Sequence, residues 1–233
     1  MFSNIGKVIF PHTNLGKVES YDLIFNPNEF IVFYLYVLLK KINKRKFAAD
    51  FGANLGLHSI ILNKLGYNVE AYEPDPETFK KLKKNIKLNK LKNVKLKKYA
   101  VFSKSGQINF TRLNDNLTGS HIENLKKSYG SKKHFKVKMK DIKDLIHKFD
   151  LVKLDIESAE ANVICRLNKK NFLNKDFIIE IGNLQNAKKI FNFLKKNRFS
   201  FYSQKSNFKK VKYFNQMPVS HKDGALIITQ NFI

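Results

Sequence analysis

Asp-Phe-Gly-Ala-Asn-Leu-Gly, residues 50–56, is the stretch that decides how this chain of 233 residues folds. It follows the apolar run 47–49 and comes before a second apolar segment that leads to Glu73. This order predicts a strand, a tight turn and the first turn of a helix. Gly52 and Gly56 have no Cβ, so the backbone can bend sharply and approach a ligand closely, while the helix start offers free N–H groups. We therefore expect a nucleoside-binding site at this turn.

The residues around the turn distinguish between possible nucleosides. Glu73 lies 23 residues beyond Asp50, about where a βαβ unit places the acid that accepts hydrogen bonds from a ribose. A dinucleotide site has the pattern G-x-G-x-x-G, but here Asn54 holds the position of the middle glycine. An Asp50 side chain pointing into the pocket would repel a phosphate and attract an ammonium group. The pattern therefore favours S-adenosylmethionine (SAM), which has an ammonium group and no phosphate, over a nicotinamide cofactor.

Six segments resemble the FkbM-type methyltransferases, in the same order and at similar spacing. They span about residues 47–182 and read DFGANLGLHS (50–59), AYEPDPETF (71–79), NIKLN (85–89), AVFSKSG (100–106), VKLDIESAE (152–160) and IIEI (178–181). The family usually has glycine at the position of Ser158, so the backbone conformation after Glu157 is in question, because glycine reaches φ angles that serine avoids. The resemblance implies a SAM-dependent methyltransferase.

The resemblance also implies which residues hold the cofactor. The methionine part of SAM would be held by the turn, the ribose by Glu73, and the adenine by the backbone of Ala100 and Val101. In an open α/β sheet, ligands bind outside the carboxyl ends of the strands, so Asp155 is a further candidate for cofactor binding. The predicted cofactor-binding residues are Asp50, Gly52, Asn54, Gly56, Glu73, Ala100, Val101 and Asp155.

Methyl transfer to an alcohol requires a base that takes the proton of the acceptor hydroxyl. The candidates are Asp155, Glu157 and His121, the last of which lies in a polar loop. Asp155 and Glu157 could instead hold a divalent cation, because hard oxygen ligands suit magnesium, and we find no cluster of histidines and cysteines for zinc. The alternative is that Asp155, Glu157 and Glu180 are solvated or cap helices, and that His121 is a surface residue.

From Phe47 onward, segments with the patterns of strands and helices alternate, which predicts a doubly wound α/β fold with a mostly parallel, seven-stranded, Rossmann-like methyltransferase sheet. We expect a methyltransferase domain over 28–233 with a loop insertion at 112–133, preceded by an N-terminal arm or hairpin over 1–27. The predicted strands are 47–51, 68–72, 94–102, 107–111, 135–139, 151–155, 176–182, 199–203 and 225–229, and the predicted helices are 57–65, 76–89, 142–149, 159–167 and 184–197.

The apolar run Phe30–Leu39 predicts a buried helix that starts at Asn28 and packs on the sheet, with a membrane-surface helix as the alternative. Ten residues are too few to span a bilayer, for which about 20 are needed. The N-terminus lacks the pattern of a signal peptide, so we expect a cytoplasmic protein. Cys165 is the single cysteine, which excludes an intramolecular disulfide, and its helical setting predicts a core residue.

The net charge of +25 could attract RNA, anionic lipid or an acidic glycan. Residues 80–98 contain ten lysines and no acid. They also contain no aromatic residue, whereas proteins that bind single-stranded nucleic acids usually stack bases on aromatic side chains. The charge therefore favours solubility and a general attraction to anions over a specific nucleic-acid site.

The sequence predicts a soluble SAM-dependent O-methyltransferase that acts on a hydroxyl group of a sugar, glycan or small metabolite. Two alternatives stay open at this point. One is an RNA methyltransferase that uses the basic surface, and the other is a protein that binds SAM without turnover, for which Ser158 is the motivation. The methyl acceptor, the oligomeric state and the need for a metal do not follow from the sequence.

Overall fold

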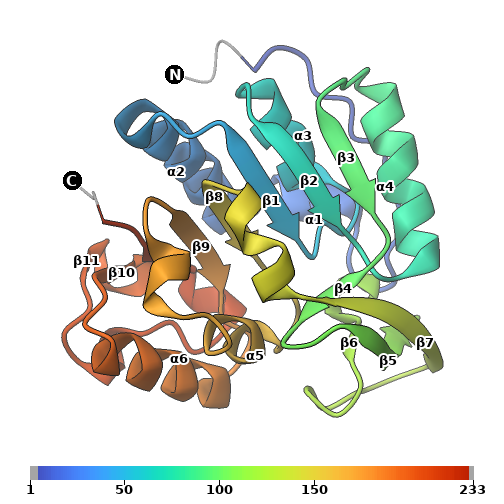
Figure 1. The fold of residues 1–233 in the computed structure, drawn as a ribbon. Coiled ribbons are helices and arrows are strands. Elements are labelled where there is room, and N and C mark those ends of the chain that lie inside the picture. Colours follow the sequence, from blue (N-terminus) through green and yellow to red (C-terminus); the bar gives the residue numbers. More distant parts are fainter. Residues whose placement is uncertain (1–4, 231–233) are drawn as a thin grey trace.

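A large central sheet with helices on both faces organises the computed structural model, which describes residues 5–230 (Figure 1). The strand order is β11-β10-β12-β9-β8-β1-β2-β3. Five neighbouring strands are parallel, namely β3 (Val94–Lys97), β2 (Asn68–Tyr72), β1 (Phe47–Phe51), β8 (Leu151–Leu154) and β9 (Asp176–Glu180). Three antiparallel pairings complete the sheet through β12 (Ala225–Ile228), β10 (Phe201–Ser203) and β11 (Lys209–Lys210).

The doubly wound, mostly parallel sheet agrees with the prediction, but it has eight strands among the described residues instead of seven. The additional strand is β11, which contributes two residues at the edge of the sheet and pairs with β10. So short a strand has no alternation of apolar and polar residues, and for that reason its sequence gives no signal. The last two predicted strands, 199–203 and 225–229, are present as β10 and β12, which pair antiparallel.

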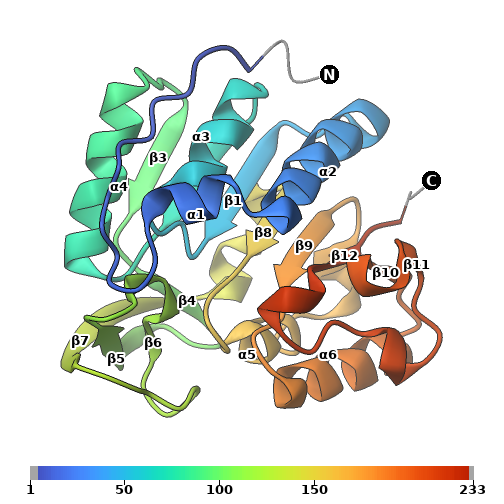
Figure 2. The same ribbon diagram turned by 180° about the vertical axis from the view of Figure 1, so that it is seen from behind.

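Each face of the sheet has its own layer of helices and its own core. On one face lie α2 (Pro27–Asn43), α3 (Leu57–Lys64) and α4 (Pro76–Leu88), whose apolar residues form two of the core clusters. On the other lie α5 (Glu160–Ile164), α6 (Leu184–Lys196) and the short 3-10 turns Ile142–Asp144 and Ile146–Lys148, in a third cluster. Figures 1 and 2 show these two layers from opposite sides.

Helix boundaries follow from their caps. The side chain of Asn26 accepts a hydrogen bond from the backbone N–H of Asn28, and Pro27 occupies the first helical position of α2. The helix therefore starts before the predicted Asn28. Asp75 caps α4 in the same way, accepting from the backbone N–H groups of Glu77 and Thr78.

A second, four-stranded sheet was only partly predicted. Its strand order is β4-β7-β5-β6, made of β4 (Ala100–Phe102), β7 (Lys132–Asp141), β5 (Gly106–Leu113) and β6 (His121–Ile122). The predicted strand over 94–102 is wrong as a single unit, because β3 belongs to the large sheet and β4 to the small one. Likewise, the loop predicted over 112–133 contains β6, the turn Leu117–Gly119 and the start of β7. We call residues 112–131 the lid.

The N-terminal segment crosses the molecule as an extended arm and joins the lid. Residues 1–27 were expected to form an arm or hairpin, and within them the chain forms the short helix α1 (Ser20–Ile24). Leu15 is completely buried, and its carbonyl accepts from the backbone N–H of Leu117 at 2.9 Å, while the N–H of Lys17 donates to the carbonyl of Asp115 at 2.7 Å. The arm and the lid therefore support each other. The predicted division into residues 1–27 and 28–233 stays a prediction, and residues 1–4 and 231–233 lie outside the described part.

The position of Cys165 and the lengths of the helices bear on two expectations from the sequence. Cys165 was predicted to lie in the core, but it is exposed at the end of α5 because that helix stops at Ile164. Within residues 5–230, no helix is both long enough and apolar enough to cross a bilayer.

Candidate functional site

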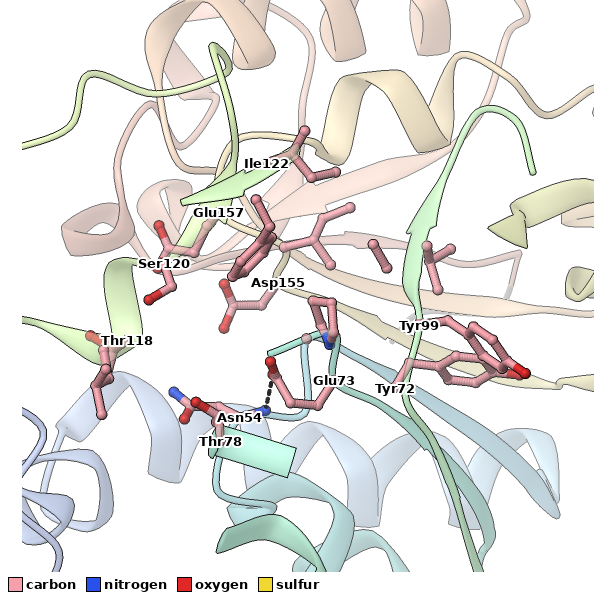
Figure 3. Close-up of a pocket in the computed structure, with 17 residues that line it drawn as sticks. Asn54, Tyr72, Glu73, Thr78, Tyr99, Thr118, Ser120, Ile122, Asp155 and Glu157 are labelled. Carbon is pink, nitrogen blue, oxygen red and sulfur yellow. Dashed lines mark hydrogen bonds between the residues drawn. The ribbon is translucent and has the colours of Figure 1, made fainter. Parts of the chain in front are cut away.

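A cavity lies at the carboxyl ends of the central strands, between the large sheet and the small one. The space between its lining residues is about 620 Å³, part of which is open to solvent. Its walls come from four places: the turn after β1, the end of β2, strand β4 and the residues after β8. Phe110, Ile122 and the lid residues Thr118 and Ser120 close the remaining side (Figure 3).

The glycine turn is pressed against the end of β8. A Cβ on Gly52 would lie 1.7 Å from the carbonyl oxygen of Asp155, and the φ angle of Gly52 is +80°. No side chain fits at this position without moving the backbone. The N–H groups of Gly52 and Ala53 both donate to the carbonyl of Tyr72, at 3.1 and 2.9 Å. The turn is therefore held in place by the neighbouring strand β2.

Glu73 stands at the end of β2 and faces the cavity. Its two carboxyl oxygens accept hydrogen bonds from the backbone N–H groups of Asn54, at 3.0 Å, and Asp75, at 2.8 Å (Figure 3). Burial raises the pKa of Glu73 to about 8, although the two N–H donors oppose the shift. The side chain of Asn54 also lines the cavity, and its Oδ1 is buried without a hydrogen-bond partner. Both side chains thus offer oxygen acceptors to a ligand.

An ion pair that the sequence did not reveal joins the small sheet to this wall. Arg112, on β5, donates from Nε and from a second guanidinium nitrogen to both carboxyl oxygens of Asp75, at 2.5 and 2.6 Å. Asp75 is almost completely buried and also caps α4. The N–H of Asp75 donates to Glu73. By holding Asp75 in place, Arg112 therefore also helps to fix the position of Glu73.

Asp50 was predicted to point into the cavity, but its side chain points away from it. It has no exposed surface, its Oδ2 accepts from the hydroxyl of Ser59 at 2.6 Å, and its Oδ1 lies 3.5 Å from Nζ of Lys153. The physical reason is the alternation of side chains along β1: Ala49 and Phe51 face the layer of α5 and α6, and Asp50 faces α3. Asp50 is part of the support beneath the turn.

Gly56 does not line the cavity either. It takes a φ angle of +90° immediately before α3, and a Cβ there would lie 2.5 Å from a methyl group of Leu82. The reason for glycine at this position is the close packing of α3 against α4.

A smaller hollow of about 360 Å³ adjoins the cavity and shares Gly52, Asn54 and Asp155 with it. Its other polar residues are Glu29, His58 and Lys153. His58 lies between two partners, with Nε2 at 2.9 Å from a carboxyl oxygen of Glu29 and Nδ1 at 2.8 Å from the hydroxyl of Tyr36. Burial would raise the pKa of Glu29, but the partner His58 reverses this and holds that pKa below its usual value. The hollow therefore carries groups of both signs.

Lys153 is the cation at the centre of these acids. Its Nζ lies 3.2 Å from Oδ2 of Asp155 and 3.3 Å from the carbonyl of Gly52. Burial acts to lower the pKa of Lys153, but the carboxylates of Asp155, Asp50 and Glu29 outweigh it and raise that pKa above its usual value. Lys153 sits opposite Asp50 in the register of β1 and β8, so pairing of the two strands brings the two charges together.

Glu157 lines the cavity on the side opposite Glu73. Burial and the neighbouring Asp155 raise the pKa of Glu157 to about 7, while Lys126 acts in the other direction. Nζ of Lys126, which belongs to the lid, lies 2.5 Å from a carboxyl oxygen of Glu157. The φ angles of Glu157 and Ser158 are +52° and +80°, so Ser158 adopts the left-handed conformation that glycine would take more easily.

Glu160 and Glu180, the next two glutamates along the chain, have different environments. Glu160 is buried and accepts from the N–H groups of Ile156 and Ser158, which makes it a support for the loop after β8. Glu180 does not line the cavity; burial and the nearby Asp155 raise its pKa. Between residues 5 and 230, no group of three or more histidine, cysteine, aspartate and glutamate side chains is arranged to hold a metal ion.

His121 was a candidate base in a polar loop, but it lies in β6 with 1% of its surface exposed and does not line the cavity. Its Nδ1 is 2.8 Å from the carbonyl of Gly119 and its Nε2 is 3.1 Å from the hydroxyl of Ser128. Strand alternation explains the position, because the neighbours Ser120 and Ile122 face the cavity and His121 faces the other way. His121 is therefore not placed to act as the base.

The structure thus gathers most of the predicted residues around one cavity, namely Gly52, Asn54, Glu73, Ala100, Val101, Asp155 and Glu157. Sequence reasoning missed Glu29, His58, Lys153 and Arg112. His58 and Lys153 do lie within the segments used for the resemblance, and a signal for Lys153 was present, since a lysine inside an apolar strand needs a buried partner. Glu29 and Arg112 carried no such signal.

A sequence family and several solved structures are similar to this chain. A sequence model described as the Methyltransferase FkbM domain matches residues 50–201. The solved Precorrin-6y C5,15-methyltransferase from Geobacter metallireducens GS-15 is 13% identical, with a TM-score of 0.50 over 86% of this chain and 88% of that chain. The ribosomal protein L11 methylase from Lactobacillus delbrueckii subsp. bulgaricus is 18% identical, with a TM-score of 0.49 over 89% of this chain and 80% of that chain.

A third solved structure, M. jannaschii TYW2 in complex with AdoMet, is 14% identical and has a TM-score of 0.45 over 96% of this chain and 86% of that chain. No curated protein matches the chain. Of these three structures, only the Geobacter enzyme reaches a TM-score of 0.50. Because it is 13% identical, its similarity to this chain concerns the fold and not the substrate.

Proposed function

The chain belongs to the FkbM methyltransferase family, and from this premise we propose that it transfers a methyl group from SAM to a hydroxyl group of a sugar, glycan or small metabolite. The family membership supports a SAM-dependent methyltransferase, in agreement with the six segments that predicted it. The observation that carries the finer proposal is one cavity with a backbone-anchored carboxyl group, Glu73, on one wall and a second carboxyl group, Glu157, with a pKa of about 7 on the other.

The residues present fit SAM. The larger cavity would take the adenosine, with the ribose hydroxyls donating to Glu73 and the adenine beside Ala100 and Val101. The unpartnered Oδ1 of Asn54 adds an acceptor for an N–H group of the ligand. The adjoining hollow has both Glu29 and Lys153, which suits an amino-acid group that carries an ammonium and a carboxylate. In this proposal Asp50 acts through Lys153 and does not touch the cofactor.

SAM supplies an electrophilic methyl group when it is bound. The chain's own part is to hold the acceptor oxygen in line with that methyl group, an orientation effect of roughly 7–11 kcal/mol. Glu157 takes the proton of the acceptor hydroxyl, because a pKa of about 7 lets it be ionised at neutral pH and still bind a proton. Asp155, whose carboxylate lies against Lys153, positions the cofactor and keeps the pKa of Glu157 raised.

One alternative acceptor rests on a specific observation. RNA as the acceptor is favoured by Lys136, Lys138 and Lys140, which are exposed along β7 of the sheet that closes the cavity. Transfer of labelled methyl groups into RNA, with none into saccharides, would select this second function.

The first test of the proposal is the thermal stability of the protein with SAM and with NAD. A ligand at 100 times its dissociation constant adds about 2.7 kcal/mol to the free energy of unfolding, so SAM should raise the melting temperature and NAD should not. Transfer of labelled methyl groups from SAM to a panel of saccharides and small alcohols then tests the acceptor. Stabilisation by NAD alone would overturn the cofactor, and transfer to amines or carbon atoms only would overturn O-methylation.

A further inference from the structure

Large apolar side chains are exposed in one part of the chain more than elsewhere. Among the described residues, six of the twelve large hydrophobic side chains that are well exposed come from α1, the residue that follows it, α2 and the start of β1. Phe25 is 70% exposed and is the most exposed of all twelve. The six are Tyr21, Phe25, Phe30, Tyr34, Ile42 and Phe47.

Helix α2 explains much of this concentration. Its inner residues Phe33, Tyr36 and Leu39 are buried against the sheet. Phe30 and Tyr34, one turn apart on the outer side, are 47% and 42% exposed. A helix that is apolar all round normally lies inside a protein or against a membrane, yet Figure 2 shows α1 and α2 on the outside of the sheet with no element over them. The outer side of α2 therefore lacks an apolar partner.

An open groove continues this apolar surface toward the last strands. It runs between α2, with Tyr34 and Leu38, and the β10–β11 turn, and Lys209 and Lys210 lie along its edge. Both of these lysines are exposed. We call Phe25, Phe30, Tyr34, Leu38, Lys209 and Lys210 the aromatic–basic face.

The charge around the aromatic–basic face is positive. Lys41, Lys44 and Lys46 are exposed at and just beyond the C-terminal end of α2. The acid within α2, Glu29, points inward to His58 and is 17% exposed. Exposed aromatic rings flanked by lysines are the composition of surfaces that bind the interface of an anionic bilayer, where rings enter the headgroup region and lysines meet lipid phosphates.

We propose that the aromatic–basic face docks the protein on an anionic lipid membrane. Charge complementarity selects this occupant, because the chain carries a net charge of +25 and would be repelled by a second copy of itself or by another basic protein. Docking does not depend on methyl transfer. It does have a geometric consequence. Leu23 of α1 and Glu29 of α2 line the smaller hollow. A membrane on the outer side of these two helices therefore lies against the outer wall of that hollow.

The test is sedimentation of the purified protein with vesicles. Vesicles of phosphatidylglycerol and phosphatidylcholine in equal parts should bind the protein, and pure phosphatidylcholine should not. The variant Phe25→Ser/Phe30→Ser should lower the partition coefficient about tenfold, because two exposed rings lose their apolar contact with lipid. Lys209→Gln/Lys210→Gln should lower it by a similar factor at low salt, since each lysine loses its attraction to the lipid surface.

Leu184→Ser is the matched control, because Leu184 has the same exposed fraction as Phe30, 47%, and lies in α6 in the opposite helix layer. It should bind vesicles as the natural protein does. The proposal is overturned if the natural protein fails to bind anionic vesicles, if the aromatic variant binds them unchanged, or if Leu184→Ser loses as much. Sedimentation velocity without lipid tests whether a second copy of the chain occupies this face instead. A dimer that dissociates in Phe25→Ser/Phe30→Ser would make the face a contact between copies and would also overturn the proposal.

Discussion

The two walls of the cavity hold their carboxyl groups by different means. Glu73 is fixed by two backbone N–H donors, from Asn54 and Asp75, within segments that the large sheet positions. Glu157 stands on a left-handed stretch of backbone and pairs with one flexible side chain, Lys126 of the lid. Burial raises the pKa of both groups. The difference indicates that a backbone-held acid suits a constant ligand such as the cofactor, whereas a side-chain partner can give way to an incoming acceptor.

The largest expected effect comes from removing the backbone-held acid. Glu73→Ala deletes the acceptor for both ribose hydroxyls. A hydrogen bond to a charged carboxylate is worth about 1.5–3 kcal/mol, so in calorimetric titrations above pH 8, where Glu73 is ionised, the dissociation constant for SAM should rise about a thousandfold. Glu70→Ala is the control, because Glu70 lies on the same strand, accepts from Tyr72 and does not line the cavity. Unchanged SAM binding in Glu73→Ala would show that this wall does not hold the cofactor.

Glu157→Gln tests the opposite wall. It should lower kcat about a hundredfold by removing the base, and leave the affinity for SAM within about twofold of the natural value. In the natural protein kcat/KM should rise with pH through about 7, because Glu157 of the free enzyme must lose its proton before it can accept one from the acceptor. The variant should lose this dependence. A large loss of SAM affinity in Glu157→Gln would mean that the two walls do not have separate roles.

Lys126→Met sharpens the comparison by removing the exchangeable partner. Since the charge of Lys126 lowers the pKa of Glu157 in the free enzyme, its loss should move the rise of kcat/KM to higher pH and reduce kcat/KM at pH 7 about fivefold. Lys127→Met, a change at the adjacent lysine, controls for the loss of a lid charge, because Lys126 is the residue that pairs with Glu157. An unshifted pH profile in Lys126→Met would contradict the assigned contact.

The smallest effect concerns the backbone beneath Glu157. Ser158→Gly should raise the free energy of unfolding by about 1 kcal/mol and the melting temperature by about 2–4 °C, because glycine adopts a φ of +80° without strain and the buried hydroxyl lacks a partner. Asn207→Gly, at a φ of +54° outside the cavity, should gain less, since asparagine tolerates this conformation. A melting temperature of Ser158→Gly at or below that of the natural protein would disprove strain at this position.

Asp50→Ala would test the cofactor site only if Asp50 lined the cavity, and it does not. With Asp50 completely buried beside Lys153, the substitution removes a partner of a buried cation and destabilises the protein as well, because an uncompensated buried charge is costly. Loss of SAM binding in this variant would therefore not locate the cofactor.

The sequence by itself determined the parallel sheet, the glycine turn and the acid at the end of β2, because each depends on residues close together in the chain. Periodicity defines a strand, Gly52 permits a bend that no other residue allows, and a fixed spacing brings Glu73 to the edge where β1 also ends. The membership of the family followed from the same local segments.

Tertiary structure alone decided which face each side chain takes and which partner it meets. Asp50 turned away from the cavity because the pairing of β1 with β8 placed Lys153 opposite it. Arg112 reached Asp75 because β5 of the second sheet came to lie beside the residues that follow β2, 37 positions earlier in the chain. Burial and the charge of a neighbour set a pKa such as that of Glu157, and both arise only after distant segments pack.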